Sequence, residues 1–349
     1  MKIRQMVIAD LTAVIALWNA SVKAGEVVYR EIDEAYFEQK FLLNPSYDSS
    51  LFLVAEKDNA VIGFISGVMK KVFLANETHE NTPGYVTVLF VDKAQRLQGI
   101  GTALLNALET IMCAAGKKTV AIAGSNPVNL DWIIPGTPGH DHNNAPGMDV
   151  DGQAYPFFVK NGFEEEHREV AMYLDLKNYV WQPEITQRCE QLAAEGVYTG
   201  DYDVALNYDF NGMCDRIPSE YWRASIATEI KAWKTGKPTT DIRFLPNGKI
   251  PAGPRPLIVA THDKQIVGFT GPVDMQASGR GFFTGICTDP LYERRGIATV
   301  LFNLLMQAFV DEGASFSTLF TGDTNHAQKL YLRTGFVVAK RFAMMSRML

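Results

Sequence analysis

The chain has few cysteines and no long apolar segment. Its four cysteines, among 349 residues, show no Cys-x-x-Cys pair and no other metal-ligand spacing. We therefore expect reduced thiols in a cytoplasmic protein that holds no metal. No stretch of about 20 apolar residues occurs, so no membrane-spanning helix is expected. The residues that follow Met1 also lack the apolar core of a signal peptide.

An excess of positive charge is also missing. The formal net charge is −6, whereas proteins that bind nucleic acids or anionic membranes generally present a cationic surface. Neither partner is expected. Hydrophobic residues make up 47% of the chain and charged residues 21%. A chain of this length and composition has enough apolar side chains for two domains of ordinary size.

The most informative feature that is present is a repeated loop. A strand-like segment runs into Asp92 and then Gly99-Ile100-Gly101-Thr102, and a second one runs into Asp289 and then Gly296-Ile297-Ala298-Thr299. The glycines and the aspartates keep one offset (296 − 99 = 197; 289 − 92 = 197). Glycine lets backbone approach a ligand closely, and a helix N-terminus offers N–H groups to an anion. Each copy predicts a site for a phosphate-bearing ligand.

The similarity between the two halves extends beyond this loop. Apolar residues with helical spacing follow both glycines, and strand-like segments come next at 119–123 and 316–320. Upstream, apolar pairs of segments predict hairpins at 53–64 and 258–269. Similarity that stays collinear over several elements predicts a duplicated domain.

We therefore predict an α/β protein of two tandem domains, 1–177 and 178–349, each a twisted mixed β-sheet flanked by helices. Within the first, Asp10 is expected to cap a helix whose apolar face carries Leu11 and Trp18.

The halves differ by one insertion. Gly162 and Gly335 are 173 residues apart (335 − 162 = 173), so the first half carries 24 extra residues (197 − 173 = 24) before its last helix. This insert, 125–152, is long enough to suggest a lid or a partner contact. It contains His140-Asp141-His142, which has too few ligands for a metal site, and we interpret it as a hydrogen-bonded loop.

Arg96 strengthens the phosphate interpretation, because a guanidinium gives charge-assisted hydrogen bonds to phosphate oxygens. An ordinary tight turn between a strand and a helix is the simpler reading of a single copy, and two aligned copies favour a ligand site. A dinucleotide-binding fingerprint is a further alternative. It is disfavoured because Leu104 stands where a third small residue is needed.

The strand, the Arg-x-x-Gly-x-Gly loop and the helix together resemble the acetyl-coenzyme A site of the GNAT acetyltransferase superfamily. The segment from Thr324 to Phe336 is similar to that superfamily's Asn-x-x-Ala-x-x-x-Tyr-x-x-x-Gly-Phe signature. The whole chain resembles a tandem arrangement of two such domains. The resemblance implies a sheet that splits beside its fourth strand and coenzyme A lying along the backbone of that strand.

The resemblance also implies the residues that contact the cofactor. They are Leu89, Phe90, Val91, Arg96, Gln98, Gly99, Ile100, Gly101 and Thr102 in the first half, and Ile286, Cys287, Thr288, Arg294, Arg295, Gly296, Ile297, Ala298 and Thr299 in the second. It implies Tyr331 as the acid that protonates the departing thiolate and Asn325 as a residue that positions the cofactor.

Two departures from the motif distinguish the halves. The counterpart of Tyr331 in the first half is Phe158 (331 − 158 = 173), which has no proton to give. The counterpart of Arg96 in the second half is Glu293 (293 − 96 = 197), which phosphates disfavour, although Arg294 and Arg295 adjoin it. We expect catalysis in the second half and cofactor binding in either half or in both.

The predicted function is direct transfer of an acetyl group from acetyl-coenzyme A to a small-molecule or peptide amine. No general base stands out; Asp274 and Glu229 are candidates by residue type, and a chain of water molecules is an alternative. Two other functions stay open: a non-catalytic sensor that binds coenzyme A, and an aminoacyltransferase of related tandem fold. The acidic net charge and the intact first loop disfavour the latter.

Overall fold

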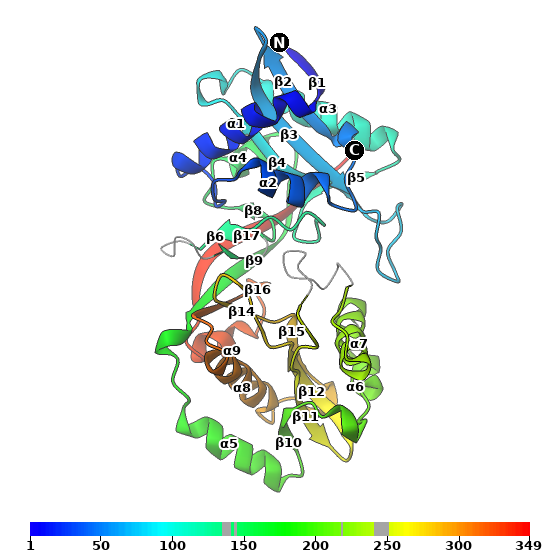
Figure 1. The fold of residues 1–349 in the computed structure, drawn as a ribbon, viewed down its shortest axis with the longest axis vertical. Coiled ribbons are helices and arrows are strands. Elements are labelled where there is room, and N and C mark those ends of the chain that lie inside the picture. The colour runs from blue at the N-terminus through cyan, green and yellow to red at the C-terminus, as the bar shows by residue number, and fades with distance from the viewer. Residues whose placement is uncertain (135–140, 143–144, 218, 241–250) are drawn as a thin grey trace. The chain divides into compact units, whose positions relative to one another are not determined.

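A computed structural model describes residues 1–134, 141–142, 145–217, 219–240 and 251–349. The chain forms two compact units (Figure 1). Unit 1 comprises Met1–Ala171 together with Ala339–Leu349, and unit 2 comprises Met172–Val338. Strand β9 (Glu164–Asp175) therefore ends in unit 2, and strand β17 (Val337–Met348) lies almost wholly in unit 1.

Unit 1 is built on a sheet with the strand order β1-β2-β3-β4-β5-β17. The first strands are antiparallel neighbours, β4 and β5 are parallel, and β17 returns antiparallel to β5. Their bounds are β1 Lys2–Gln5, β2 Phe52–Lys57, β3 Ala60–Met69, β4 Gly84–Val91 and β5 Thr119–Ile122.

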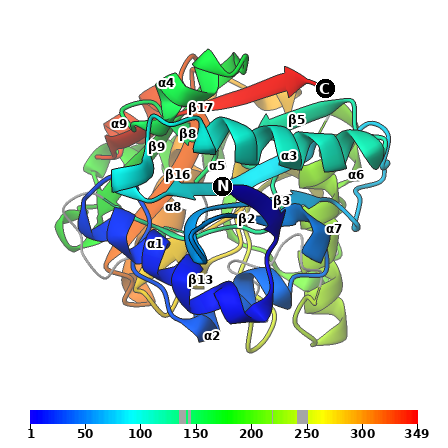
Figure 2. The ribbon, with the colours of Figure 1, turned by 90° about the horizontal axis from the view of Figure 1, so that it is seen from above.

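Helices cover both faces of this sheet (Figure 2). They are α1 Leu11–Lys23, α2 Glu34–Phe37 with a π-helical turn Glu38–Leu42, α3 Ile100–Ala114 and α4 Ala154–Lys160. On one face Trp18 of α1 packs against Phe90 with ring centroids 5.1 Å apart. On the other, a Cβ on Gly63 would lie 3.0 Å from Leu104 of α3 and one on Gly67 2.9 Å from Leu108, so these glycines let α3 sit close to β3.

The prediction that Asp10 caps α1 is wrong. Asp10 directly precedes the helix, but its carboxylate makes no cap hydrogen bond. It accepts hydrogen bonds from Arg4 at 2.6 and 2.9 Å and from the Val7 amide at 2.9 Å. The neighbouring Arg4 guanidinium outcompetes the helix N–H groups because a charge-assisted, two-point contact is stronger than a cap.

Unit 2 has a related arrangement, in which the strands form two groups. One has the order β10-β11-β12-β15 and the other β16-β14-β13. The bounds are β10 Tyr198–Asp201, β11 Ile258–His262, β12 Gln265–Gly271, β13 Asp274–Met275, β14 Arg280–Phe282, β15 Gly285–Thr288 and β16 Phe316–Gly322. The helices are α5 Pro183–Ala194, α6 Asn211–Arg216, α7 Glu220–Thr235, α8 Ile297–Asp311 and α9 Gln328–Arg333.

The duplication is visible in the bounds themselves. Helices α3 and α8 begin and end at the same offset (297 − 100 = 197; 311 − 114 = 197). The predicted mixed α/β architecture of two related halves is confirmed. The predicted domain boundary between residues 177 and 178 was drawn from the sequence repeat and stays a prediction. The pairing of residues 339–349 with the sheet of unit 1 was not part of that prediction.

The insert adds short strands to unit 1. These are β6 Trp132–Ile133, paired with β7 Asp141–His142, and β8 Met148–Asp149, paired with β17 through Phe342 and Ala343. Gly147 permits this contact, because a Cβ there would lie 2.3 Å from the Ala343 carbonyl oxygen. His140 lies outside the described residues. Within the part of the chain that is described, no cluster of three or more His, Cys, Asp or Glu side chains has a metal-binding arrangement.

Candidate functional site

The two predicted loops have the same backbone conformation. Before α3, Leu97 and Gly99 have positive φ angles of 62° and 81°, and before α8, Arg294 and Gly296 have 62° and 86°. The offset is again 197 (294 − 97 = 197). Alternating left-handed residues turn successive N–H groups toward one side, which makes an anion-binding concavity at the helix N-terminus. Leu97 itself is fully exposed, so its side chain does not fill this concavity.

The first N–H groups of α3 and α8 belong to predicted cofactor residues. Neither helix has a side-chain cap, so its first amides have no intrahelical or capping partner. The space beside Gly99 is open, because a Cβ on this residue would meet none of the described atoms within 4 Å. A Cβ on Gly101 would instead lie 3.2 Å from the Phe157 ring. Thr102 uses its hydroxyl to donate to Asn161 at 3.0 Å, which ties the helix to the end of α4.

The shared aspartates stabilise the turns that lead into the loops. Asp92 accepts a hydrogen bond from the Ala94 amide at 2.9 Å, and Asp289 accepts one from the Leu291 amide at 3.0 Å. Asp289 is in addition paired with Arg216, which keeps the pKa of this carboxyl below its usual value despite its burial. Their role is structural.

Arg96 is held in place by the protein. Its Nη2 donates to Glu26 Oε2 at 2.7 Å, and its Nε donates to the Val91 carbonyl at 3.0 Å. The hydrogen bond from Arg96 lowers the pKa of Glu26, so this carboxylate is charged at neutral pH. The pair connects the segment after α1 to the end of β4.

The second loop obtains its positive charge from different residues. Glu293 is exposed beside it. Arg188 of α5 lies over the loop: a Cβ on Gly296 would be 2.9 Å from both Cδ and Nε of its side chain. Arg295 stacks on the Tyr292 ring and lies 3.9 Å from Glu195. Arg188 is not among the predicted site residues, because it belongs to a helix far upstream of the loop in sequence.

In each unit the strand that precedes the loop parts from its parallel neighbour. Strand β4 pairs with β5 at Gly84–Val120 and Tyr85–Ala121 and then continues to Val91 beside β3 without β5. In unit 2 the pairs are Arg280–Phe316 and Gly281–Ser317. The registers agree at the common offset (281 − 84 = 197; 317 − 120 = 197). The fork leaves the backbone of Val86–Val91 open to a ligand on the side that β5 has left.

A bulge interrupts the strand just beyond this fork. Ser66 pairs with Val88 and Gly67 with Val86, so Thr87 is an extra residue in β4. The equivalent residue of unit 2 is Thr284 (284 − 87 = 197), which falls in the gap between β14 and β15. Bulges re-aim backbone groups and are common beside active sites. Sequence reasoning missed this feature, although the matching threonines at the common offset were visible.

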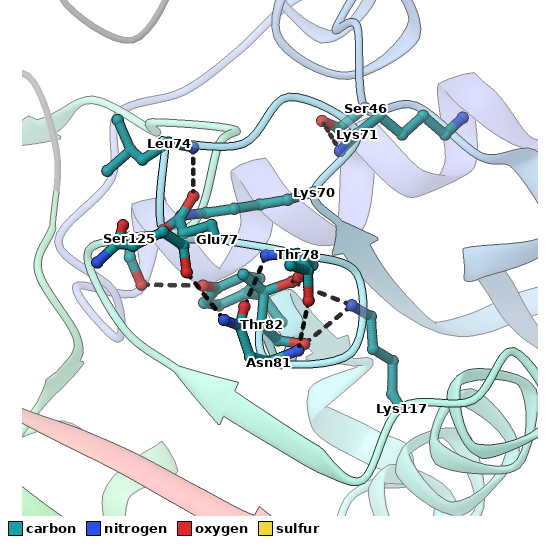
Figure 3. Close-up of polar contacts among 12 residues, drawn as sticks. Ser46, Lys70, Lys71, Leu74, Glu77, Thr78, Asn81, Thr82, Lys117 and Ser125 are labelled. Carbon is teal, nitrogen blue, oxygen red and sulfur yellow. Dashed lines mark hydrogen bonds and ion pairs between the residues drawn. The ribbon is translucent and has the colours of Figure 1, made fainter. Parts of the chain in front are cut away.

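A polar network fixes the chain that leads into β4 (Figure 3). Lys117 is buried, and its Nζ donates to the carbonyls of His79 and Thr82 at 2.6 and 2.9 Å. Burial lowers the pKa of Lys117. Glu77 accepts from Lys70 at 2.6 Å in the same loop. These contacts hold the start of β4 in the register that produces the fork.

A cavity of about 120 Å³ lies at the bulge in unit 1. Its walls come from β4, from the segment after α1, from the insert and from β17. They include Val86, Val88, Phe90, Ile122, Phe158 and Phe342, with Glu26 and Asp149 among the polar residues. A larger cavity of about 740 Å³ shares Glu26 and Asp149 and extends to Asp151 and Lys340. The insert was predicted to form a lid or a partner contact, whereas no role in a site was predicted for the C-terminal strand.

Tyr331 and Phe158, the equivalent residues of the two units, have similar aromatic surroundings. Tyr331 is 7% exposed and packs 5.0 Å from Phe302 and 6.2 Å from Phe336. Phe158 is 2% exposed and packs 5.1 Å from Phe163, the counterpart of Phe336 (336 − 163 = 173). Burial raises the pKa of the Tyr331 hydroxyl to about 12, so it carries its proton throughout the neutral range.

Asn325 and Cys287 have local structural roles. Asn325 shapes the turn before α9, because its side chain accepts from the Ala327 amide at 2.9 Å. Cys287 is buried beside Met213, and burial raises the pKa of its thiol to about 12. A thiol of this kind is a packing residue and not a nucleophile.

The two candidate bases converge on one arginine. Glu229 of α7 and Asp274 of β13 both form ion pairs with Arg255, the latter at 3.1 Å. Glu229 and Arg255 are buried, whereas the Asp274 side chain is 20% exposed. Two carboxyl groups thus share one guanidinium. The Glu229 carboxylate is thus buried against Arg255, and the Asp274 carboxylate is more accessible to solvent.

Comparisons with known proteins agree with this geometry. Residues 15–131 and 217–336 each match the sequence model of the acetyltransferase (GNAT) family. No curated protein sequence matches the chain significantly. In the described residues no helix has the length and apolar character needed to cross a membrane.

Several solved structures share the fold. A glucosamine N-acetyltransferase region of a fungal multi-domain β-N-acetylglucosaminidase superposes with a TM-score of 0.61 at 15% identity, covering 99% of this chain and 38% of that one. A GCN5-related N-acetyltransferase from Sphaerobacter thermophilus gives 0.57 at 16% identity, covering 99% and 95%. A tandem GNAT protein of the clavulanic acid biosynthesis pathway gives 0.56 at 13% identity, covering 99% and 98%.

Proposed function

Because the chain belongs to the acetyltransferase (GNAT) family, with two GNAT regions in tandem, we propose that it transfers an acetyl group from acetyl-coenzyme A directly to an amine and that unit 2 carries out the transfer. The observation that carries this proposal is the repeated arrangement of fork and left-handed loop at one common offset. It combines an open strand backbone with a cluster of N–H groups, which suits a long ligand with a phosphate end.

In this proposal the pyrophosphate of coenzyme A binds the amides of residues 98–102 in unit 1 and 295–299 in unit 2. The pantetheine arm lies along Leu89–Val91 or Ile286–Thr288 and exchanges hydrogen bonds with the strand beyond the fork. Arg96 supplies charge to the first loop. Arg188 and Arg294 supply positive charge to the second loop, where Glu293 takes the place of Arg96.

The chemical step needs a group that stabilises the leaving thiolate. The amine nitrogen bonds to the thioester carbonyl carbon, the carbon–sulfur bond breaks, and coenzyme A leaves as a thiolate while the new ammonium loses a proton to solvent or a base. Tyr331 is the proposed hydroxyl that meets this thiolate, and Asn325 shapes the turn that presents α9. Phe158 offers no such group, which favours unit 2 as the catalytic unit.

The pKa of Tyr331 refines this role. At about 12 it lies above the reference value of about 8.5 for a thiol, so tyrosine is the weaker acid. Complete proton transfer to the thiolate is uphill. The hydroxyl therefore acts as a hydrogen-bond donor that stabilises the developing negative charge, and the thiolate takes its proton from solvent once coenzyme A has left.

The acceptor is proposed to be a small-molecule or peptide amine. The net charge of −6 and the two carboxyl groups that share Arg255 suit a cationic amine. Asp274 is the better candidate to receive its proton, because Glu229 is buried on Arg255. The fungal protein that shares the fold is described as a glucosamine N-acetyltransferase, so amino sugars belong among the acceptors to test.

We place the protein in the cytoplasm, where acetyl-coenzyme A is available and where its four free cysteines stay reduced. A thiol-release assay with acetyl-coenzyme A and separate panels of amino sugars, polyamines, amino acids and peptide N-termini tests the activity. Acetyl-coenzyme A binding without turnover on any panel would favour a sensor instead, and turnover only with aminoacyl-tRNA would favour an aminoacyltransferase.

A further inference from the structure

The cavity at the bulge of unit 1 has apolar walls. Val86, Val88 and Phe90 come from β4, and Phe158 and Phe342 come from α4 and β17. All five side chains are at most 5% exposed. Glu26 and Asp149, which also line the cavity, form ion pairs with Arg96 and Lys340 at 2.7 and 2.5 Å. The apolar part of this wall favours an apolar group.

The volume of the cavity indicates the size of that group. An engineered apolar cavity of about 150 Å³ takes benzene, which has six non-hydrogen atoms. By this measure a cavity of about 120 Å³ holds roughly five such atoms. An acetyl group has three, so it would leave space for about two further carbons. Unfilled apolar space costs binding energy that a longer chain recovers.

Phe158 is the residue of this cavity that corresponds to Tyr331 of unit 2. It lines the cavity with a bare ring where unit 2 has the Tyr331 hydroxyl. The ring adds apolar surface for an acyl chain and offers no hydrogen bond to a leaving thiolate. The site is thus suited to holding a thioester and poorly suited to cleaving it.

We propose that unit 1 binds a coenzyme A thioester whose acyl chain is longer than acetyl, of about four carbons, and retains it without transferring the acyl group. The proposal rests on the proposed function, because it uses the same loop and fork to hold coenzyme A. It assigns the two units different acyl preferences: acetyl for transfer in unit 2, and a short aliphatic chain for binding in unit 1.

The test is calorimetric titration of the full chain with coenzyme A and with its acetyl, butyryl, hexanoyl and succinyl thioesters. Burying two more methylenes should make butyryl-coenzyme A bind one site about tenfold more tightly than acetyl-coenzyme A. Succinyl-coenzyme A, of equal chain length, should lose this gain because its terminal carboxylate would be buried among apolar side chains. Hexanoyl-coenzyme A should gain nothing further.

Two variants change the volume of the cavity in opposite directions. Val88→Leu reduces it and should shift the preference back toward acetyl, whereas Phe158→Leu enlarges it and should shift the preference toward hexanoyl. Val159→Phe is the control, because Val159 is 48% exposed on the same helix as Phe158. Thermal unfolding of each variant confirms that it is folded, and opposite shifts from the two variants exclude a general loss of structure.

Three outcomes are distinguishable. A butyryl preference that Val88→Leu and Phe158→Leu move as stated supports the proposal. Binding of all thioesters with acetyl as tight as butyryl, or a butyryl preference that neither variant moves, overturns it and leaves the proposed function intact. Failure of every thioester and of coenzyme A itself to bind overturns both.

Discussion

Phe158 and Tyr331 occupy equivalent positions in the two units, 173 residues apart (331 − 158 = 173), and each packs against the phenylalanine that follows five residues later. Both side chains are buried. The two positions therefore differ chiefly by one hydroxyl group. We propose that this hydroxyl separates a unit that transfers an acyl group from one that only binds it.

The raised pKa of Tyr331 predicts a broad alkaline plateau. The hydroxyl is protonated, and able to donate, at every pH well below about 12, and its contribution is lost only as the pH rises through that value. We expect kcat to show no decline attributable to this tyrosine between about pH 7 and pH 10. Measuring kcat across that range, with tyrosinate absorbance followed in parallel, checks this. A decline in kcat near about pH 9 that is absent from Tyr331→Phe would contradict it.

Gly99 is predicted to be essential for coenzyme A binding in unit 1. Its φ of 81° suits glycine, and the space around it is open. Gly99→Val should disrupt the left-handed loop and abolish calorimetric binding at this site. Gly116→Val is the matched control, since Gly116 has a φ of 88° and equally open surroundings at the far end of α3. Equal loss of binding in both variants would show that the effect is one of general stability.

Arg188 is predicted to hold the cofactor phosphates in unit 2. In a Gly99→Val background, where only unit 2 binds, Arg188→Gln should weaken coenzyme A binding by roughly tenfold or more, the range for loss of a charge-assisted hydrogen bond. Arg168→Gln serves as the control, because it removes the same charge from unit 1, where Arg168 pairs with Glu165 on β9. Unchanged affinity in the Arg188→Gln chain would leave Arg294 and the amides as the phosphate contacts.

Unit 1 is predicted to depend on the end of the chain. Strand β17 pairs with Thr119–Ile122 of β5, and Phe342 is fully buried 5.3 Å from Trp132. A chain that ends at Val338 should expose the β5 edge and a large apolar surface, and we expect it to aggregate. Addition of a peptide spanning 337–349 should restore its solubility, measured by size-exclusion chromatography. A monomeric, fully stable shortened chain would refute this dependence.

Much of the fold could be predicted from the sequence because the two duplicated halves can be compared with each other. The glycine pair Gly99 and Gly296 defines the offset at which the loops, the helices and the strand pairs of both units coincide. The threonine pair Thr87 and Thr284 follows the same offset, so the equivalence of the two positions could be read from the sequence, but the bulge at Thr87 could not. It was missed because a threonine in a strand carries no signal of a bulge by itself.

Contacts between residues distant in sequence were not predictable in this way. Arg188 reaches Gly296 only because α5 packs beside α8, and Phe342 reaches the cavity only because β17 pairs with β5. Asp10 shows the reverse: its position before a helix predicts a cap, but Arg4 on a neighbouring strand takes the carboxylate. Local patterns predict local structure, and such tertiary partners override them.

Acetyl transfer by unit 2 depends, in our proposal, on the hydroxyl of Tyr331. The most direct measurement is kcat for amine-dependent thiol release by Tyr331→Phe and wild type, with Tyr155→Phe as a control for removing a tyrosine hydroxyl elsewhere. We expect a fall of roughly 10²–10⁴-fold in Tyr331→Phe, with coenzyme A affinity and melting temperature nearly unchanged. Full activity in a well-folded Tyr331→Phe chain would contradict this role.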